Sequence, residues 1–127
     1  MSEGHDDVID RVTRVIYAEA RGEPYSGKIA VAWVIKNRFN NPRKIYGKTI
    51  TEITQKKSQF VYWVKDVDDL QSWNDCINAA EDVFYRGVED PTHGSTHFLS
   101  GNACPSWAKN KKSVVVIGGH RFYNNID

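Results

Sequence analysis

The chain has 127 residues, with 17 Lys and Arg against 16 Asp and Glu, which gives a formal net charge of +1. This length fits one compact domain, so we expect residues 1–127 to share a single core. The balanced charge argues against nucleic-acid binding, which normally requires a basic surface. No apolar run reaches the ~18 residues of a membrane span, and the N-terminus lacks the basic and apolar regions of an export signal. We therefore expect a monomer that binds no nucleic acid, inserts into no membrane and carries no export signal of its own.

The two cysteines, Cys76 and Cys104, lie far apart in the sequence and do not form a CxxC pair. In a chain without an export signal, two reduced thiols are the expected state, and a single disulfide is the alternative. Neither the cysteines nor any other pattern predicts a metal ion or another cofactor.

Three segments have the apolar spacing of α-helices, and they cover about residues 7–20, 27–38 and 72–86. The middle segment is apolar on all sides at its centre, which predicts a core helix surrounded by protein, with a buried strand as the alternative. Ser26 and Ser72 are the predicted N-caps of the second and third helices.

Shorter elements are expected between and after these helices. Thr51 is a candidate cap for a short helical turn, while the aromatic segment 59–64 fits either a strand or an extended loop. Three β segments are expected at residues 95–99, 113–117 and 120–123. Gly118 and Gly119 predict a two-residue hairpin between the last two. Helices followed by a small antiparallel sheet indicate an α+β fold.

Glu19 is the residue whose position first suggests chemistry. It follows Val12, Val15 and Ile16 on the apolar face of the first helix. A carboxyl group on such a face is desolvated, which raises its pKa and suits it to protonate a leaving oxygen. The alternative is a salt bridge to a nearby arginine; Arg14, Arg21 and Arg38 are the candidates.

The sequence around Glu19 resembles that of a known family. The run Val15 to Arg38, VIYAEARGEPYSGKIAVAWVIKNR, is similar to the opening motif YxEARGExxxGxxAVAxVxxNR of the SleB/CwlJ cell-wall hydrolases. Four further blocks follow in the family's order, at Gln59-Phe60, 90–98, 105–108 and 117–123. The resemblance therefore extends over nearly the whole chain, from about Val8 to Tyr123.

The resemblance implies a lysozyme-like fold that is mainly helical, with a small antiparallel sheet in its C-terminal part. It implies peptidoglycan as the substrate and Glu19 as the catalytic glutamate. Family members characterised as lytic transglycosylases cleave the β-1,4 bond between N-acetylmuramic acid and N-acetylglucosamine. We therefore expect the same reaction here, ending in 1,6-anhydro products and used for cell-wall lysis.

Muramidase-type hydrolysis of the same bond is the first alternative, and it requires a second carboxylate within about 5 to 9.5 Å of the first. Glu23, Asp66, Asp68 and Asp69 are the candidates, but no motif singles out any of them. A transglycosylase needs only one acid/base, because the 6-hydroxyl of the muramic acid replaces water. This simpler requirement favours transglycosylation.

Six residues are candidates for substrate binding: Tyr17, Gln59, Phe60, His97, Trp107 and Tyr123. All lie within blocks that match the family, and their side chains can stack on sugar rings or hydrogen-bond N-acetyl groups. The alternative for each aromatic residue is packing in the core, for Gln59 it is stabilisation of a turn, and for His97 it is a structural hydrogen bond. Val61 departs from the family, in which a small hydroxyl residue usually follows Gln-Phe.

Two other classes of function stay open. His93, His97, His120 and Cys104 could bind zinc in an amidase, although Pro91 and Gly94 argue against a helical His pair and no HExxH motif is present. A glycan-binding module without catalysis is the other alternative. A wall hydrolase made in the cytoplasm without a leader also resembles a phage endolysin, which would act on the host wall after release.

Overall fold

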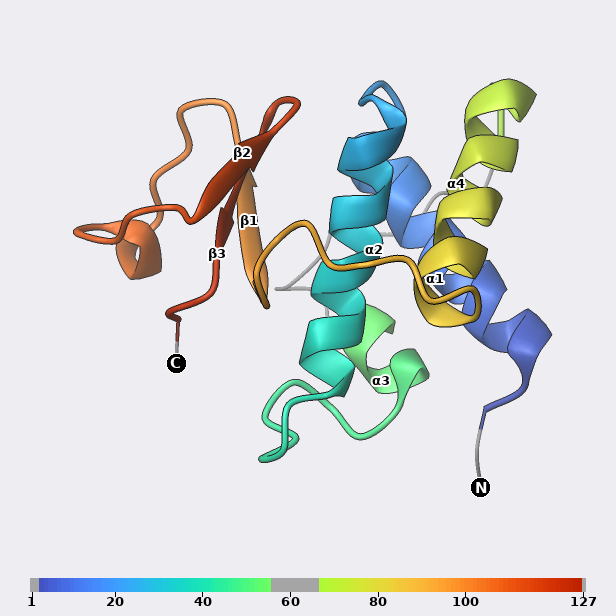
Figure 1. Ribbon diagram of the computed structural model, residues 1–127, viewed down its shortest axis with the longest axis horizontal. Coiled ribbons are helices and arrows are strands. Elements are labelled where there is room, and N and C mark those ends of the chain that lie inside the picture. The colour runs from blue at the N-terminus through green and yellow to red at the C-terminus, as the bar shows by residue number, and fades with distance from the viewer. Residues whose placement is uncertain (1–2, 56–66, 127) are drawn as a thin grey trace.

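The computed structural model describes residues 3–55 and 67–126, and these form four α-helices beside one three-stranded sheet (Figure 1). The elements are α1 (His5–Ala20), α2 (Tyr25–Phe39), α3 (Ile50–Gln55), α4 (Leu70–Phe84), β1 (His97–Ser100), the short 3₁₀ helix η1 (Ser106–Ala108), β2 (Val115–Ile117) and β3 (His120–Tyr123). The helices come first and the sheet last, so the expected α+β fold is confirmed.

Helix α2 is the centre of the molecule. Ala30, Val31, Ala32, Val34 and Ile35 are all fully buried, as expected for a helix that is apolar on every side. It contacts α1, α3 and α4 as well as strands β1 and β2, and Figure 1 places it between the sheet and the other long helices. The predicted core helix is confirmed, and the alternative of a buried strand is excluded.

The helix starts differ from the predictions. Ser26 is not the N-cap of α2, because the helix begins at Tyr25 after Pro24. Helix α4 begins at Leu70 and is capped by Asp69, whose side chain accepts the N–H of Ser72. Proline pre-orients a helix start, and an aspartate accepts an N-terminal N–H as readily as a serine, so several residues competed for each start.

The start of α3 was also predicted wrongly. Thr51 lies inside this helix and does not cap it. The side chain of Thr49 accepts the N–H of Glu52 instead, while the Glu3 carboxylate accepts the N–H groups of Ile50 and Thr51. A carboxylate from the distant N-terminal segment therefore satisfies the free donors of this short helix.

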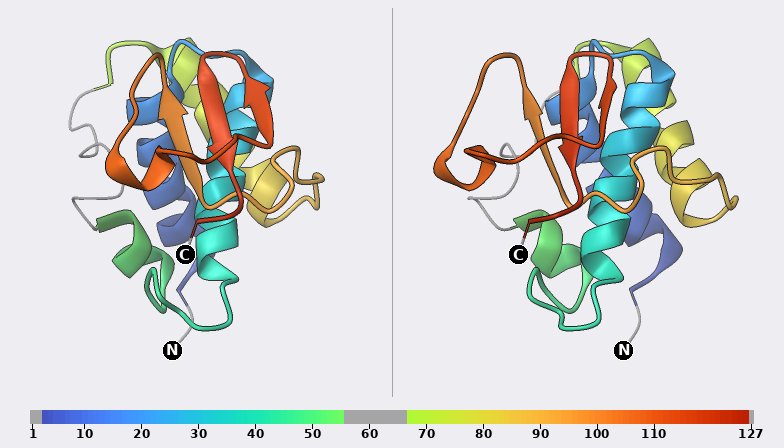
Figure 2. Two further views of the ribbon diagram at one scale, coloured as in Figure 1. Left: turned by 90° about the vertical axis from the view of Figure 1, so that its left-hand side faces the viewer. Right: turned by 60° about the vertical axis from the view of Figure 1, so that its left-hand side comes forward.

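The sheet is antiparallel with strand order β1-β3-β2, so β3 is the central strand. Gly118 and Gly119 connect β2 to β3 in the expected tight hairpin, and Gly118 has a φ of 57°. Such a backbone conformation favours glycine. Figure 2 shows the sheet lying across one side of the helical part, in front of α2.

The segment between α4 and β1 is fastened to α2. The Asn37 side chain donates to the Asp90 carboxylate and to the Ser95 carbonyl, each at 2.9 Å. Burial acts to raise the pKa of Asp90, but the hydrogen bonds from Thr92, Asn37 and Gly94 outweigh it and hold the pKa below its ordinary value. The chain thus enters the sheet from a position fixed by the core helix.

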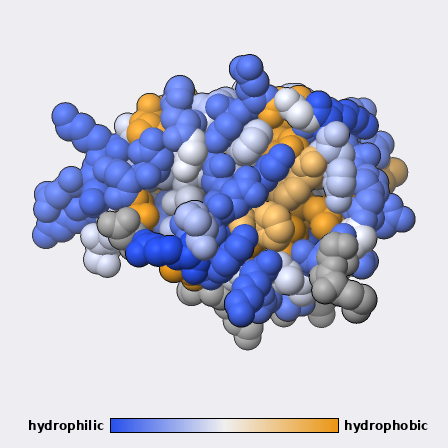
Figure 3. Space-filling model, turned by 60° about the horizontal axis from the view of Figure 1, so that its bottom comes forward, coloured by the Kyte–Doolittle hydropathy of each residue, from blue (hydrophilic) through white to orange (hydrophobic). Residues whose placement is uncertain are grey.

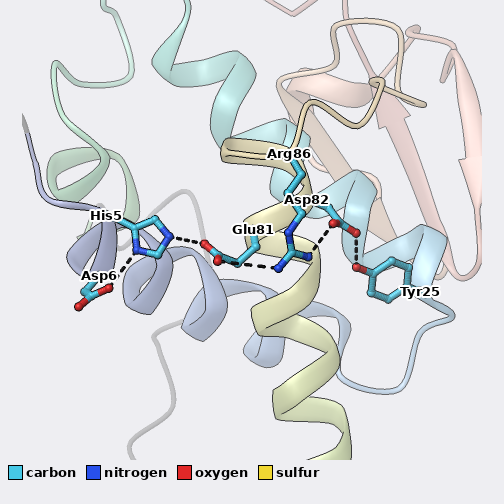
Figure 4. A network of polar contacts seen from close by, with 6 residues as sticks. All are labelled: His5, Asp6, Tyr25, Glu81, Asp82 and Arg86. Carbon is cyan, nitrogen blue, oxygen red and sulfur yellow. Dashed lines mark hydrogen bonds and ion pairs between the residues drawn. The ribbon is translucent and has the colours of Figure 1, made fainter.

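A polar network connects the starts of α1 and α2 to the last turns of α4 (Figure 4). His5 contacts Glu81, which pairs with Arg86, and Arg86 pairs with Asp82. Asp82 in turn accepts the Tyr25 hydroxyl at 2.6 Å. Most of these side chains are partly solvated, so each pair contributes little to stability, and the network chiefly orients the helix ends.

A pocket of about 310 Å³ lies at the end of the helical part where α3 is found. Val8, Phe39, Ile50 and Phe84 form much of its apolar wall. Figure 3, which brings this end forward, shows an apolar strip among hydrophilic residues. Of the predicted site residues that the structure describes, none lines this pocket, so we treat it separately from the candidate site.

The structure also bears on membrane spans and on the state of the two cysteines. Among the described residues, no helix has both the length and the apolar character needed to cross a membrane. Cys76 and Cys104 are both free thiols, the first buried and the second exposed. Burial raises the pKa of Cys76 to about 12, so this thiol stays protonated at neutral pH.

Candidate functional site

Glu19 lies at the edge of the core, on the last turn of α1. Val12, Val15 and Ile16 on the same helix face are fully buried, whereas Glu19 itself is half-buried. The carboxyl group therefore stands where the apolar core meets more accessible surface, the kind of environment in which an acid can both exchange protons and be desolvated.

The three arginines that could pair with Glu19 have different surroundings. Arg14 forms an ion pair with Asp10 one helical turn away, and Arg21 forms one with Asp68. The charge of Glu19 acts on Arg38, on α2, where it partly opposes the lowering of that arginine's pKa by burial. Arg38 is therefore a charged neighbour of the kind that the salt-bridge alternative anticipated.

Arg38 is only 3% exposed, and its partners come from several parts of the chain. Its Nε donates to the Thr96 carbonyl at 2.7 Å, and its guanidinium lies over the Tyr46 ring, 5.0 Å from the centroid. Burial lowers the pKa of Arg38 to about 10, against the opposing effects of Tyr46 and Glu19. Arg38 is therefore a cation at neutral pH, held between the helices and the start of β1.

His97 is the first residue of β1 and is half-buried. Its Nδ1 is 2.9 Å from the Thr96 hydroxyl, and its ring lies 5.9 Å from that of Tyr46 and 4.8 Å from that of Trp107. Burial, and then the charge of Arg38, lower the pKa of His97 to about 4. The imidazole is therefore neutral at neutral pH, able to accept and to donate one hydrogen bond.

Trp107 and Tyr123 continue this row of rings. The half-buried Trp107 belongs to η1 and packs edge-on against Tyr123 at 5.3 Å. Tyr123 lies opposite His97 in the β1–β3 pair, and its hydroxyl accepts a hydrogen bond from Arg121. We call Tyr46, His97, Trp107 and Tyr123 the aromatic row. His97 and Trp107 are its accessible members, because Tyr46 and Tyr123 are only 6% and 2% exposed.

Tyr17 is in the core. Its ring is 2% exposed and packs edge-on against Trp73, while Arg21 lies over its face. Its hydroxyl donates to Asp68 and accepts the N–H of Asp69. For Tyr17, as for the buried Tyr123, this placement favours the core-packing alternative over contact with a substrate.

Gln59 and Phe60 lie outside the described residues, so their predicted substrate contacts stay predictions. Sequence reasoning missed two residues, Tyr46 and Thr96, and considered Arg38 only as a possible partner of Glu19. Arg38 is the last residue of the opening motif at residues 15–38, and this position was a signal in the sequence that could have identified it as a site residue. Tyr46 had none, because its position beside Arg38 and His97 depends on the tertiary fold.

The four candidates for a second catalytic carboxylate have different contacts in the structure. Asp68 pairs with Arg21 and Tyr17, and hydrogen bonds from Tyr17 hold its pKa below its ordinary value. Asp69 caps α4. Glu23 accepts the N–H of Gly119 at 2.6 Å, and Asp66 lies outside the described residues. Three of the four thus take part in hydrogen bonds or ion pairs of the fold.

The zinc alternative required histidines and Cys104 to gather around one ion. In the part of the chain that the structure describes, no three His, Cys, Asp or Glu side chains form such a group. His120 is buried beside Phe98 and Phe122, whereas His93 is exposed in a turn with a φ of 55°.

Comparisons with known proteins support the expected family. The model of the family described as Cell Wall Hydrolase matches residues 22–123. The spore cortex-lytic enzyme of Halalkalibacterium halodurans is 28% identical over 94% of this chain, and that of Oceanobacillus iheyensis is 28% identical over 90%. The matched regions are 35% and 40% of those relatives, so the chain spans well under half their length.

Two solved structures have the same fold. The catalytic domain of Bacillus cereus SleB aligns with a TM-score of 0.74 at 22% identity, over 96% of this chain and 93% of that one. The catalytic domain of SleB from Bacillus anthracis, titled a germination-specific lytic transglycosylase, aligns with a TM-score of 0.71 at 23% identity, over 94% and 95%. The mainly helical fold with a small sheet is therefore that of SleB catalytic domains.

Proposed function

The chain belongs to the Cell Wall Hydrolase family, and from this we propose that it degrades peptidoglycan by cleaving the glycan strand. The bond is the β-1,4 linkage between N-acetylmuramic acid and N-acetylglucosamine, and the reaction is that of a lytic transglycosylase. The relatives named above are spore cortex-lytic enzymes. The Bacillus anthracis domain of the same fold is described as a lytic transglycosylase, which supports this reaction.

Glu19 is the single acid/base of the proposed reaction. Its protonated carboxyl donates to the glycosidic oxygen as the bond to the muramic acid C1 breaks. The carboxylate then accepts the proton of that sugar's own 6-hydroxyl, whose oxygen bonds to C1 and closes the 1,6-anhydro ring. The proton returns to Glu19, no water is consumed, and no second carboxylate is needed.

The observation that supports Glu19 most directly is its half-buried place on the last turn of α1, together with the engagement of Glu23, Asp68 and Asp69 elsewhere. Because these carboxylates already have partners, the contacts favour a mechanism with one catalytic carboxylate over a mechanism that requires two.

His97 and Trp107 are the proposed substrate contacts among the described residues. A neutral imidazole can hydrogen-bond a sugar hydroxyl or N-acetyl group without placing a second cation near Arg38. The half-buried Trp107 ring can stack on the apolar face of a sugar. Gln59 and Phe60 are proposed for the same surface on the strength of the family motif alone.

Mass spectrometry of the soluble products from purified sacculi tests the reaction. We expect 1,6-anhydro-muramic ends, which are lighter by one water than hydrolysed reducing ends. Hydrolysed ends would instead identify a muramidase. New amino termini, with activity abolished by a chelator, would identify a zinc amidase and contradict the assignment of Glu19. Binding without any product would leave a glycan-binding module.

The bacterial cell wall is the proposed place of action. A phage endolysin released into an infected host is a prediction from the sequence, whereas the relatives named above belong to spore-forming bacteria. A holin-like gene beside the coding gene would support the phage origin, and an upstream in-frame secretion leader would contradict it.

A further inference from the structure

We propose that Glu23 is a positioning residue, which holds the β2–β3 hairpin against the helices and thereby places the sheet relative to Glu19. Glu23 lies in the turn between α1 and α2, four residues after Glu19. Its effect on activity rests on the function proposed above, whereas the contact itself can be tested without any substrate.

The first support is a short hydrogen bond between distant parts of the chain. The N–H of Gly119 donates to Glu23 Oε1 at 2.6 Å, across a sequence separation of 96 residues. A hydrogen bond to a carboxylate is about twice as strong as one between neutral groups. The bond therefore secures the tip of the hairpin to the turn that follows the helix of Glu19.

The second support is the space around the carboxylate, which glycines provide. A Cβ at Gly118 would lie 2.1 Å from Glu23 Oε1, and one at Gly119 would lie 3.1 Å from Oε2. On the helix side, a Cβ at Gly27 would lie 3.0 Å from the Cβ of Glu23. A side chain at Gly118 would displace the Glu23 carboxylate, and side chains at Gly119 and Gly27 would crowd Glu23. The three glycines therefore leave room for Glu23 to approach the hairpin.

His120 adds a buried polar group to this contact. The residue is 3% exposed, and its Nδ1 lies 3.9 Å from Glu23 Oε1. Within the described structure, this nitrogen is buried and has no hydrogen-bond partner. Because burial of an unpaired polar atom is costly, the nearby carboxylate compensates part of that cost. Glu23 thus lies close to two successive residues, the last residue of the hairpin turn and the first residue of β3.

The consequence for the site follows from the position of β3. At its start, β3 is attached to the helical part through Glu23. At its end, the backbone carbonyl of Tyr123 accepts a hydrogen bond from the N–H of Thr96. The carbonyl of Thr96 in turn accepts a hydrogen bond from Arg38. The central strand is therefore attached at both ends, and His97, which pairs with Tyr123, is fixed relative to α1 and α2.

This assignment differs from the role of a second catalytic carboxylate, for which Glu23 was a candidate. A positioning residue needs an oxygen that accepts the Gly119 N–H, and glutamine supplies one. A general base or nucleophile needs the negative charge, which glutamine lacks. The pair Glu23→Ala and Glu23→Gln therefore separates the two roles.

The experiment compares Glu23→Ala and Glu23→Gln with wild type, and uses Glu89→Ala, an exposed glutamate outside the site, as the matched control. Hydrogen exchange of the Gly119 amide by NMR reports the contact, and kcat and KM on soluble glycan chains report its effect. We expect Glu23→Ala to accelerate Gly119 exchange and to lower kcat by about 10- to 100-fold with a smaller change in KM, because displacement of the sheet misplaces the substrate. Glu23→Gln should keep most of the activity and protection.

Each contrary result has a distinct meaning. Unchanged Gly119 exchange in Glu23→Ala would overturn the contact, and faster exchange with unchanged kcat would overturn the positioning role. A loss in Glu23→Gln as deep as that in Glu19→Gln would show that the charge takes part in the chemistry. If wild type cleaves no peptidoglycan, the proposed function fails while the exchange result still stands. Should Glu23→Ala fail to fold, Glu23→Asp, one methylene shorter, replaces it in the same comparison.

Discussion

Arg38 illustrates how a single side chain can set the electrostatics of the site. Its buried guanidinium is stabilised by the Thr96 carbonyl, the Tyr46 ring and the charge of Glu19. A buried cation of this kind is tolerated only with such partners. The same charge acts on His97 and, after burial, is the second cause that lowers the pKa of that imidazole.

The protonation state of His97 gives a direct prediction. Its pKa of about 4 lies below the ordinary value of 6.5, so the folded protein keeps the ring neutral while the unfolded chain takes up a proton as the pH falls. The stability contributed by neutral His97 is therefore present above pH 6.5 and is lost between pH 6.5 and about 4. An NMR titration, assigned with His97→Gln, should show the ring neutral at pH 5.5. A midpoint near 6.5 would contradict the described surroundings.

At the scale of elements, α2 is the helix around which the other elements pack. Its side chains are buried on every side, because α1, α3 and α4 cover one part of its surface and the sheet covers another. Interiors of this kind are closely packed, so the loss of a few methyl groups leaves a cavity that the neighbours fill only partly.

Ile35 tests this packing. Ile35→Ala removes a fully buried side chain from α2 and should lower the free energy of unfolding by about 3 kcal/mol. Ile45→Ala makes the same chemical change at a residue that is 42% exposed, and should change it by less than about 1 kcal/mol. Urea unfolding followed by circular dichroism measures both. Equal effects of the two substitutions would contradict the central place of α2.

The elements that sequence reasoning predicted well are those with local causes. The interiors of α1, α2 and α4 and the Gly118-Gly119 hairpin follow from side-chain periodicity and turn chemistry, and all are present. The helix starts were less predictable. Asp69 competed with Ser72 at α4, and the distant Glu3 supplies acceptors for α3. Such long-range partners leave no local signal in the sequence.

The residues of the candidate site likewise fall into those with a local sequence signal and those whose placement depends on the tertiary fold. Glu19 could be singled out from its helix face and motif, and His97 and Trp107 from the blocks that resemble the family. The burial of Tyr17 and Tyr123 could not, because an aromatic residue has the same local pattern in a core and at a binding surface. The contact of Glu23 with Gly119 depends on how α1, α2 and the hairpin meet, which no local pattern specifies.

For the whole molecule, the proposed chemistry depends on how the helical part and the sheet are held together. Glu23 holds the hairpin, Arg38 and Asn37 hold the entry to β1, and Glu19 lies on the last turn of α1. The family match begins at residue 22, just after Glu19. The role of Glu19 is therefore proposed from its motif and its position, and a direct measurement tests it.

That measurement is the rate at which Glu19→Gln clears purified sacculi, compared with wild type and with Glu89→Gln as the matched control. Glutamine keeps the size and hydrogen bonding of Glu19 but cannot act as an acid or base, so we expect a rate lower by about 10²- to 10⁴-fold. Unchanged thermal unfolding would confirm that the variant is folded, and Glu89→Gln should behave as wild type. If Glu19→Gln clears sacculi as fast as wild type, Glu19 is not the acid/base and the proposed mechanism is wrong.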